Sequence, residues 1–277
     1  MVKNIKEILW EARLALKEKH IDEREARLLL AFSLGISKEE LITKNTCTLR
    51  EYDKFITVLN KRLIGMPYAY IVGHKEFMKL DFEVNKNVLI PREDTEILVQ
   101  EVLKIGRKKV LDMCTGSGCI AVSVAKYLEE SIVDAVDISE RALTIAKVNA
   151  KKNGVVVNFI KSNLFEEVDE KYDVIVSNPP YIKTEDLETL QIEVKNEPVK
   201  ALDGGKTGLY FYQKIIKEAP KHLKENGVLI FEIGFDQAED VKKLMEKNNF
   251  QHIEIMKDLS GNDRVIKGDI ACHLHQN

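Results

Sequence analysis

The sequence lacks an excess of charge and any long apolar run, and each lack excludes a class of protein. Lys and Arg number 42 against 45 Asp and Glu, a net charge of -3, so no overall positive field draws the chain to nucleic acid. No run approaches the ~18 apolar residues of a membrane span, and the amino end lacks a signal peptide's apolar core. We therefore expect a cytoplasmic protein without membrane or stable nucleic-acid binding.

The sequence also has few residues that could form disulfides or bind a metal. The 4 cysteines include no C-x-x-C pair, so reduced thiols are expected. His273 and His275 lie near the end of the chain, but two histidines alone make a poor metal site. We expect no metal and a solvated terminus. With 277 residues, 44% of them hydrophobic, the chain is long enough for a proper core in one large or two ordinary domains.

The hydrophobic period divides the chain. Residues 1 to 65 show helical spacing throughout, and the stretches Ser37–Glu40 and Thr48–Glu51 fit capping boxes. From Met66 the period becomes 2: Leu80–Val84 and Val88–Ile90 flank a polar turn, which predicts a β-hairpin. We expect a helical domain over residues 1–66, a linker with this hairpin over 67–90, and a larger domain over 91–277.

The larger domain alternates helices and strands. Asp94 or Thr95 is expected to cap a helix that ends at Gly106. Further helices are predicted over 118–128, 139–153 and 237–248, and strands over 109–113, 132–136, 155–160, 172–177, 227–233, 250–257 and 264–272. Strands separated by helices imply an α/β fold with a doubly wound, mostly parallel sheet.

A glycine-rich loop follows the first strand of that sheet. The loop contains Cys114, Thr115, Gly116, Ser117 and Gly118, and its glycines let the backbone approach a ligand closely. Asp137 closes the next strand, where a carboxylate can accept both hydrogens of a ribose diol.

Dinucleotides and S-adenosylmethionine both use this layout. A dinucleotide site needs G-x-G-x-x-G, but Cys114 takes the first glycine's place and Ala121 the third. The loop resembles the methyltransferase pattern Asp-x-Gly-x-Gly-x-Gly more closely, with Asp112 at its head. Asp112 would then orient the loop and face the cationic methionine end of the cofactor.

A second motif, Asn178-Pro179-Pro180-Tyr181, follows the fourth strand. Prolines fix φ and donate no N–H, so a carboxamide, a rigid carbonyl and an aromatic face converge. Two acceptors suit the two hydrogens of a planar NH₂ group, and the ring covers it. The motif resembles the signature of S-adenosylmethionine-dependent methyltransferases that act on adenine N6, guanine N2 or glutamine N5. It leaves the acceptor molecule open.

The chain departs from the methyltransferase pattern in two places. The first is Cys114 in the glycine-rich loop, and the second is the loop over Ser162–Phe165. Asn163 stands where these enzymes often carry Asp, and its carbonyl can still accept the adenine amino group. Leu164 and Phe165 pack either on the adenine or in the core.

Further blocks between Pro67 and Gly268 resemble one family, the peptide-chain release factor glutamine N5-methyltransferases. They include Pro67–Gly73, Val88–Glu96, Asn196–Pro198 with Ala201–Gly205, Phe231–Gly234 and Asp258–Arg264. The resemblance implies methyl transfer to the glutamine amide of the Gly-Gly-Gln loop of class-1 release factors, which supports translation termination. The helical domain would dock the substrate.

The same resemblance implies the site residues. Catalysis falls to Asn178, Pro179 and Tyr181. S-adenosylmethionine would contact Asp112, Cys114, Thr115, Gly116, Ser117, Gly118, Asp137, Asn163, Leu164 and Asn178. The substrate would contact Asn178, Pro179, Pro180, Tyr181 and Glu197.

Two other functions fit parts of the sequence. A nucleic-acid amino methyltransferase must flip its base out and needs a basic approach surface, against which the acidic balance speaks. An idle adaptor that binds a nucleotide-like ligand would not need the intact Asn178–Tyr181 motif.

Overall fold

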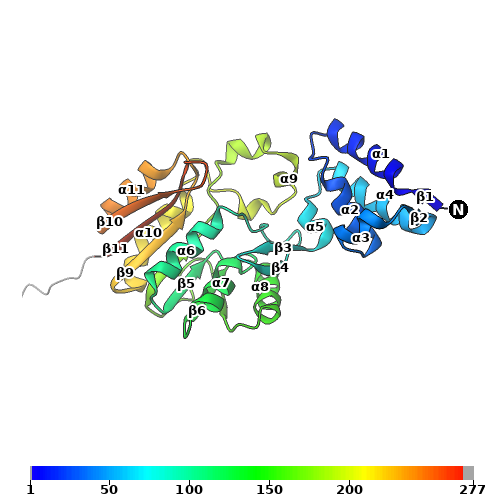
Figure 1. The fold of residues 1–277 in the computed structure, drawn as a ribbon. Coiled ribbons are helices and arrows are strands. Elements are labelled where there is room, and N and C mark those ends of the chain that lie inside the picture. The colour runs from blue at the N-terminus through cyan, green and yellow to red at the C-terminus, as the bar shows by residue number, and fades with distance from the viewer. Residues whose placement is uncertain (1, 271–277) are drawn as a thin grey trace, which may run out of the picture. The chain divides into compact units, whose positions relative to one another are not determined.

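The computed structural model describes residues 2–270 (Figure 1), and the chain divides into two compact units. The first, which we call the helical unit, contains the chain up to Gly73 together with Gln191–Asn196. The second, the sheet unit, contains His74–Leu190 and the chain from Glu197 on. No helix within residues 2–270 is both long enough and apolar enough to cross a membrane.

The helical unit has five helices from the amino-terminal part of the chain: α1 (Ile5–Glu18), α2 (Glu25–Leu34), α3 (Lys38–Thr43), α4 (Leu49–Leu63) and α5 (Tyr68–Val72). Both predicted capping boxes are confirmed, at the starts of α3 and α4. The expectation of a wholly helical segment is wrong at β1 (Val2–Asn4), which pairs antiparallel with β2 (Thr46–Thr48). Thr48 must be extended to cap α4, and the strand that ends on it buries Cys47.

A segment distant in sequence completes this unit. α9 (Ile192–Lys195) packs so closely that a Cβ on Gly65 would lie 2.5 Å from Ile192 Cγ1. The buried guanidinium of Arg62 bonds Glu25 through Nε at 2.5 Å and Glu193 through Nη2 at 2.9 Å. Two carboxylates thus pair with a cation that is costly to bury alone, although its Nη1 has no hydrogen-bond partner within residues 2–270.

The sheet unit opens with a β-hairpin, but not the predicted one. β3 (His74–Phe77) pairs with β4 (Leu80–Glu83), whereas the predicted partner Val88–Ile90 forms no strand. The turn residues Met78 and Lys79 have φ of 50° and 58°, and neither is a residue type that signals such a turn. Ile90 instead donates its N–H to Glu197 Oε2 at 2.9 Å.

The main sheet has seven strands in the order β10-β11-β9-β8-β5-β6-β7. The parallel strands are β5 (Lys109–Met113), β6 (Ile132–Asp137), β7 (Asn158–Lys161), β8 (Tyr172–Ser177) and β9 (Leu223–Glu232). β10 (Phe250–Lys257) and β11 (Asp263–Ile270) run antiparallel at one edge. The strand order reverses between β5 and β8, the point where ligands bind in open α/β sheets.

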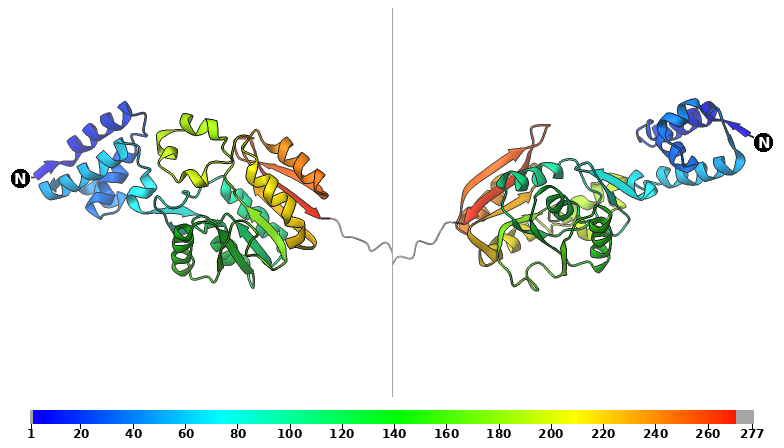
Figure 2. Two further views of the ribbon diagram at one scale, coloured as in Figure 1. Left: turned by 180° about the vertical axis from the view of Figure 1, so that it is seen from behind. Right: turned by 60° about the horizontal axis from the view of Figure 1, so that its bottom comes forward.

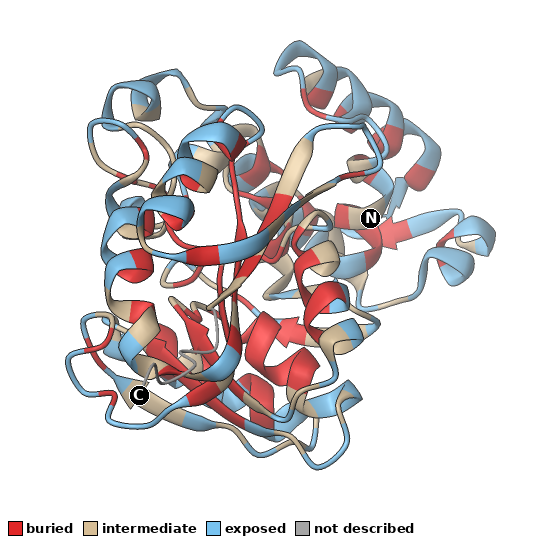
Figure 3. Cartoon of the chain, turned by 90° about the vertical axis from the view of Figure 1, so that its left-hand side faces the viewer, coloured by how far each residue is buried: buried red, intermediate tan, exposed pale blue. Residues whose placement is uncertain are grey.

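Helices cover both faces of the sheet (Figure 2). One core cluster lies among β5, β8, β9 and the helices α10 (Tyr210–His222) and α11 (Ala238–Lys247). The other lies against α6 (Thr95–Ile105) and α7 (Cys119–Tyr127), with α8 (Glu140–Lys152) beside α7. Buried residues accordingly concentrate in the strands and the inner faces of helices (Figure 3). The predicted fold class is confirmed.

Most predicted elements of this unit are present, with ends shifted by one to a few residues. The strands over 109–113, 172–177 and 250–257 are confirmed residue for residue. α10 was not predicted, nor were the short helices η1 (Thr184–Thr189) and η2 (Val199–Ala201). The predicted end of the last strand at 272 and the terminus with His273 and His275 lie outside the described residues.

Candidate active site

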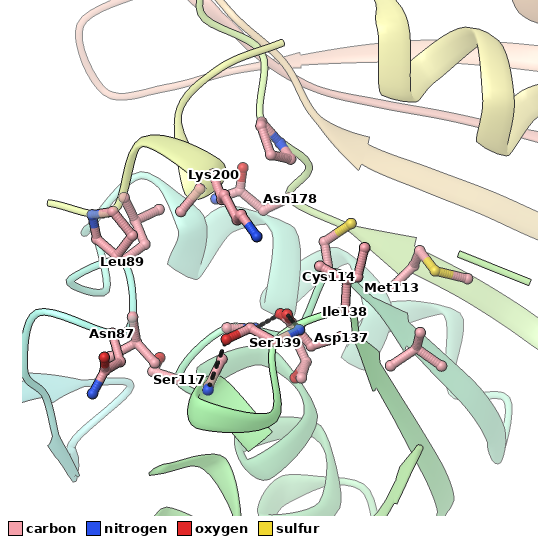
Figure 4. Close-up of a pocket in the computed structure, with 18 of the residues that line it drawn as sticks. Asn87, Leu89, Met113, Cys114, Ser117, Asp137, Ile138, Ser139, Asn178 and Lys200 are labelled. Atoms are coloured by element: carbon pink, nitrogen blue, oxygen red, sulfur yellow. Dashed lines mark hydrogen bonds between the residues drawn. The ribbon is translucent and has the colours of Figure 1, made fainter. Parts of the chain in front are cut away.

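A cavity of about 870 Å³ lies in the sheet unit, beside the carboxyl ends of β5, β6 and β8 (Figure 4). Nine of the predicted site residues line it: Cys114, Thr115, Gly116, Ser117, Asp137, Asn163, Leu164, Asn178 and Pro180. The other five do not, namely Asp112, Gly118, Pro179, Tyr181 and Glu197. The structure therefore brings both predicted motifs to one cavity, with part of each motif behind its wall.

Asp112 shapes the glycine-rich loop from behind. Its Oδ2 accepts hydrogen bonds from Thr115 Oγ1 at 2.6 Å and from the Ala121 N–H at 3.1 Å, so it ties the loop to α7. Burial raises the pKa of this carboxyl to about 7, against the lowering effect of both bonds. Its Oδ1 is buried and has no hydrogen-bond partner among the described residues. Asp112 thus orients the loop, as predicted, but is not on the cavity wall.

The loop turns through left-handed backbone at Cys114, Gly116 and Gly118, whose φ values are 66°, 56° and 80°. A Cβ on Gly118 would lie 3.0 Å from Ala146 Cβ, so glycine is needed where the loop meets α8. Cys114 carries a side chain at a φ that L-residues rarely adopt, and its sulfur faces the cavity (Figure 4). Burial raises the pKa of its thiol, which disfavours the reactive thiolate form.

Asp137 links the loop to the end of β6. Its Oδ2 accepts the Gly116 N–H at 2.9 Å and its Oδ1 the Ser139 N–H at 2.8 Å. Burial raises the pKa of Asp137, and a carboxylate has about four lone-pair sites, so it can also accept a bond from a ligand hydroxyl. Ile138, which lines the cavity and is 57% exposed, was not predicted; an apolar residue directly after the acidic one was the available signal.

The loop after β7 supplies another part of the wall. Asn163 Nδ2 donates to Glu166 Oε1 at 2.6 Å, which leaves Oδ1 as the acceptor of this side chain. Leu164 lines the cavity. Phe165 instead stacks on His222 with ring centroids 4.5 Å apart, so core packing is the alternative that holds for Phe165.

The Asn178–Tyr181 motif is held by side chains from three elements. Asn178 Nδ2 donates to Thr95 Oγ1 at 3.3 Å, and Thr95 Oγ1 donates to Glu232 Oε2 at 2.6 Å. The Tyr181 hydroxyl donates to Glu232 Oε1 at 3.4 Å, and the Tyr181 backbone carbonyl accepts from Gln237 Nε2 at 3.0 Å. The predicted cap of α6 is wrong for both candidates, because neither Asp94 nor Thr95 makes a cap hydrogen bond.

The segment after η2 packs against the end of this motif. Ile182 donates its N–H to the Leu202 carbonyl at 2.9 Å, and Gly204 donates to the Ile182 carbonyl at 2.7 Å. A Cβ on Gly204 would lie 2.7 Å from Tyr181 Cα, and one on Gly208 would lie 2.4 Å from the Tyr181 carbonyl oxygen. These two glycines therefore let the segment approach the Tyr181 backbone.

Glu197 supports the wall and does not line it. Its buried carboxylate accepts the Ile90 N–H and pairs with Arg92, whose side chain lies on the cavity. Arg92 was not predicted as a site residue, nor were Thr95, Glu232 and Lys200. Thr95 and Glu232 are 137 residues apart, so no local sequence pattern predicts their contact.

The cavity fits S-adenosylmethionine. Asp137 offers acceptors for a ribose diol, Asn163 Oδ1 an acceptor for an adenine amino group, and Leu164 and Ile138 apolar contact. Gly116 borders open space, since nothing lies within 4 Å of the position of its absent Cβ. Within residues 2–270, no group of three or more His, Cys, Asp or Glu side chains could hold a metal ion.

Comparisons with known proteins agree with this geometry. Residues 7–73 match the family model described as PrmC N-terminal domain, and residues 93–194 match the model described as Methyltransferase small domain. A methyltransferase structure from Pyrococcus furiosus superimposes with a TM-score of 0.57 over 71% of this chain and 92% of that one, at 20% identity, which shows the fold alone.

Curated relatives extend the likeness to the whole chain. The release factor glutamine methyltransferase of Clostridium acetobutylicum is 40% identical over 95% of this chain and 97% of its own length. That of Fusobacterium nucleatum is 49% identical over 72% of this chain, an alignment that spans 59% of the relative. That of Geobacter sulfurreducens is 40% identical over 96% of this chain and 97% of its own. The chain belongs to the release factor glutamine methyltransferase family.

Proposed function

We propose that this protein is an S-adenosylmethionine-dependent protein-glutamine N5-methyltransferase of the cytoplasm. Its substrate is the glutamine of the Gly-Gly-Gln motif of class-1 release factors, and its activity supports translation termination. Relatives named release factor glutamine methyltransferase match about 95% of the chain. The observation that carries the proposal is the fixed Asn178 side chain: its Nδ2 is held by Thr95, which leaves its carbonyl oxygen for an incoming NH₂ group.

The residues divide the chemistry as follows. When bound, S-adenosylmethionine would supply an electrophilic methyl group on a sulfonium, and Asp137, Asn163, Leu164 and the loop from Cys114 to Ser117 would hold it. Asn178 Oδ1, on the cavity wall, accepts one hydrogen of the glutamine amide, and the Pro179 carbonyl, which lies behind that wall in the ligand-free structure, is the acceptor proposed for the other. Both dipoles also stabilise the positive charge that develops on nitrogen. The Tyr181 ring, also behind that wall in the ligand-free structure, is proposed to cover the flat amide once the substrate is bound, and the surplus amide proton leaves to water.

Selection of the acceptor falls to the approach to the cavity. The two acceptors pair with any NH₂ group, so they alone do not distinguish glutamine from adenine. Ala201 and Asp203 line the cavity, and Gly204 lies against Tyr181. This segment forms one wall of a narrow slot, in which a loop with two glycines before its glutamine fits and a chain with β-carbons collides.

The test is to offer labelled S-adenosylmethionine with release factor, with the same factor carrying Gln→Asn in the tripeptide, and with DNA or tRNA. Asparagine is one methylene shorter, so its nitrogen lies about an ångström farther from the methyl group and transfer falls ~100-fold or more. Asn178→Ala serves as the matched inactive enzyme. Comparable labelling of nucleic acid, or of the asparagine variant, contradicts the proposal.

Docking of the release factor is assigned to the helical domain over residues 1–66. Trp10 in α1 is 64% exposed, an unusual exposure for the sole tryptophan of the chain. We expect Trp10→Ala to raise KM for intact release factor about 10-fold at unchanged kcat, because aromatic anchors contribute most to interfaces. The control is a Gly-Gly-Gln peptide, whose KM the substitution should not alter. An equal rise in KM for both substrates rules out docking through α1.

A further inference from the structure

Glu232, at the end of β9, is a buried carboxylate whose neighbouring cation, Arg264, pairs with other carboxylates. The side chain is 2% exposed in total, and its neighbour Arg264 pairs with Asp258 at 3.1 Å and Asp94 at 3.4 Å instead. Within residues 2–270 no salt bridge to Glu232 is found; its bonds come from the hydroxyls of Thr95 and Tyr181. A carboxylate buried in this way destabilises a fold, so its presence calls for a functional reason.

The hydrogen bonds around Thr95 run in one direction. A hydroxyl has one hydrogen, and Thr95 donates it to Glu232 Oε2 at 2.6 Å. Toward Asn178 the same oxygen can then only accept, and it accepts from Nδ2 at 3.3 Å. The NH₂ half of the Asn178 carboxamide is thereby held at Thr95, and the carbonyl half is left for a ligand.

We propose that Glu232 and Thr95 are positioning residues that set the direction of the Asn178 carboxamide, so that its oxygen meets the substrate amide. The inference rests on the proposed function, since it concerns how Asn178 receives an NH₂ group. A carboxamide turned by 180° would place donor against donor and misalign the nucleophile. The other oxygen of Glu232 binds the Tyr181 hydroxyl, so one carboxylate orients the side chains at both ends of the motif.

Ionisation of Glu232 enforces this direction. Burial raises the pKa of Glu232 to about 7, and a protonated Glu232 can donate to Thr95, which frees the Thr95 hydrogen for Asn178 Oδ1. Methyl transfer should therefore decline as the pH falls below about 7. The titratable groups that act on Glu232 come from five other parts of the unit: Asp94 before α6, Cys119 in α7, Tyr181 after β8, Tyr212 in α10 and Arg264 in β11.

Four variants test the inference. Thr95→Val keeps the shape and removes the hydroxyl, whereas Thr95→Ser keeps the hydroxyl. Ser123→Ala is the matched control, because the hydroxyl of Ser123 in α7 is buried and has no hydrogen-bond partner in the part of the chain that the structure describes. At saturating release factor and S-adenosylmethionine we expect kcat to fall ~10- to 100-fold in Thr95→Val and to stay within about threefold of wild type in Thr95→Ser and Ser123→Ala. The Kd for S-adenosylmethionine should hardly change.

The fourth variant, Glu232→Gln, separates positioning from mere packing. It keeps the shape and cannot ionise, so we expect a lower kcat that no longer rises through about pH 7. Wild-type kcat in Thr95→Val overturns the inference, as does a Thr95→Ser enzyme as slow as Thr95→Val, or a Glu232→Gln enzyme that keeps the rise with pH.

Failure of the proposed function has a different signature. In that case the wild-type enzyme itself transfers no methyl group to release factor. The direction of the Asn178 carboxamide is then compared by NMR contacts of its NH₂ protons in wild type and Thr95→Val. An unchanged direction overturns the inference, and a turned carboxamide supports it.

Discussion

Cys114 is the residue at which the cofactor loop most clearly departs from a glycine pattern. Its φ of 66° is one that glycine adopts freely and that costs other residues about 1–2 kcal/mol. Its side chain also occupies the cavity wall, beside the place proposed for the methionine part of the cofactor. Backbone strain and cavity shape therefore meet at one position.

We expect Cys114→Val to weaken S-adenosylmethionine binding about 10-fold or more, because a β-branched residue drives the loop out of the left-handed conformation that binding requires. Cys114→Gly, which removes both the strain and the side chain, should bind at least as tightly as wild type. Titration calorimetry measures both affinities. Equal affinity in the valine and glycine variants would show that the loop conformation does not govern binding.

At this scale the sequence predicted residues that are close together along the chain. Asn178 to Tyr181 are contiguous, so the sequence alone predicted that they form a site for an NH₂ group. Thr95 and Glu232 were not, because a hydrogen bond between residues 137 apart depends on how α6 packs beside β9. Glu197 was predicted to touch the substrate and instead holds Arg92, a partner 105 residues away.

Among the elements, strands were predicted well where burial decides. β5 and β8 are apolar runs at the centre of the sheet, and both are confirmed. The hairpin was predicted one strand too late, because its turn depends on the left-handed backbone of Met78 and Lys79. α10 contains Pro220, which normally argues against a helix and here lies near its end.

The segment Leu202–Gly208 packs against the Tyr181 backbone and so helps to position the Asn178–Tyr181 motif. We expect Gly204→Ala to push the Tyr181 backbone aside and to lower kcat about 10-fold, since its Cβ would meet Tyr181 Cα at 2.7 Å. Gly227→Ala is the matched control: its Cβ would meet the Lys224 carbonyl oxygen at 2.8 Å, in the first half of β9. Both variants should lose stability, by about 1–3 kcal/mol. Normal kcat in Gly204→Ala would mean that the wall of the slot can yield.

For the whole molecule, two buried carboxyls relate activity to stability. Burial raises the pKa of both Asp112 and Glu232 to about 7. Between its ordinary pKa and this value, each group binds more protons in the folded than in the unfolded chain. Their contribution to stability is therefore present at low pH and is lost as the pH rises through about 7.

We expect Glu232→Gln to stabilise the ligand-free protein at pH values above about 7 and to have little effect well below it. The gain corresponds to a pKa shift of two units or so, about 3 kcal/mol in the free energy of unfolding. Urea unfolding of both proteins across this pH range measures it, and the difference between the two curves isolates Glu232 from all other titrating groups. Parallel curves would mean that Glu232 ionises as freely in the folded as in the unfolded chain.

The closure of the helical unit by Gln191–Asn196 has a consequence for biosynthesis. The five helices up to Gly73 leave the ribosome first. Glu193, whose carboxylate is the second partner of Arg62, lies 131 residues after Arg62 in the sequence. Until Glu193 is translated, the arginine has only Glu25 as a partner. The helical unit therefore reaches its final state only after most of the parallel sheet has been translated, and its maturation depends on a long-range contact that forms slowly.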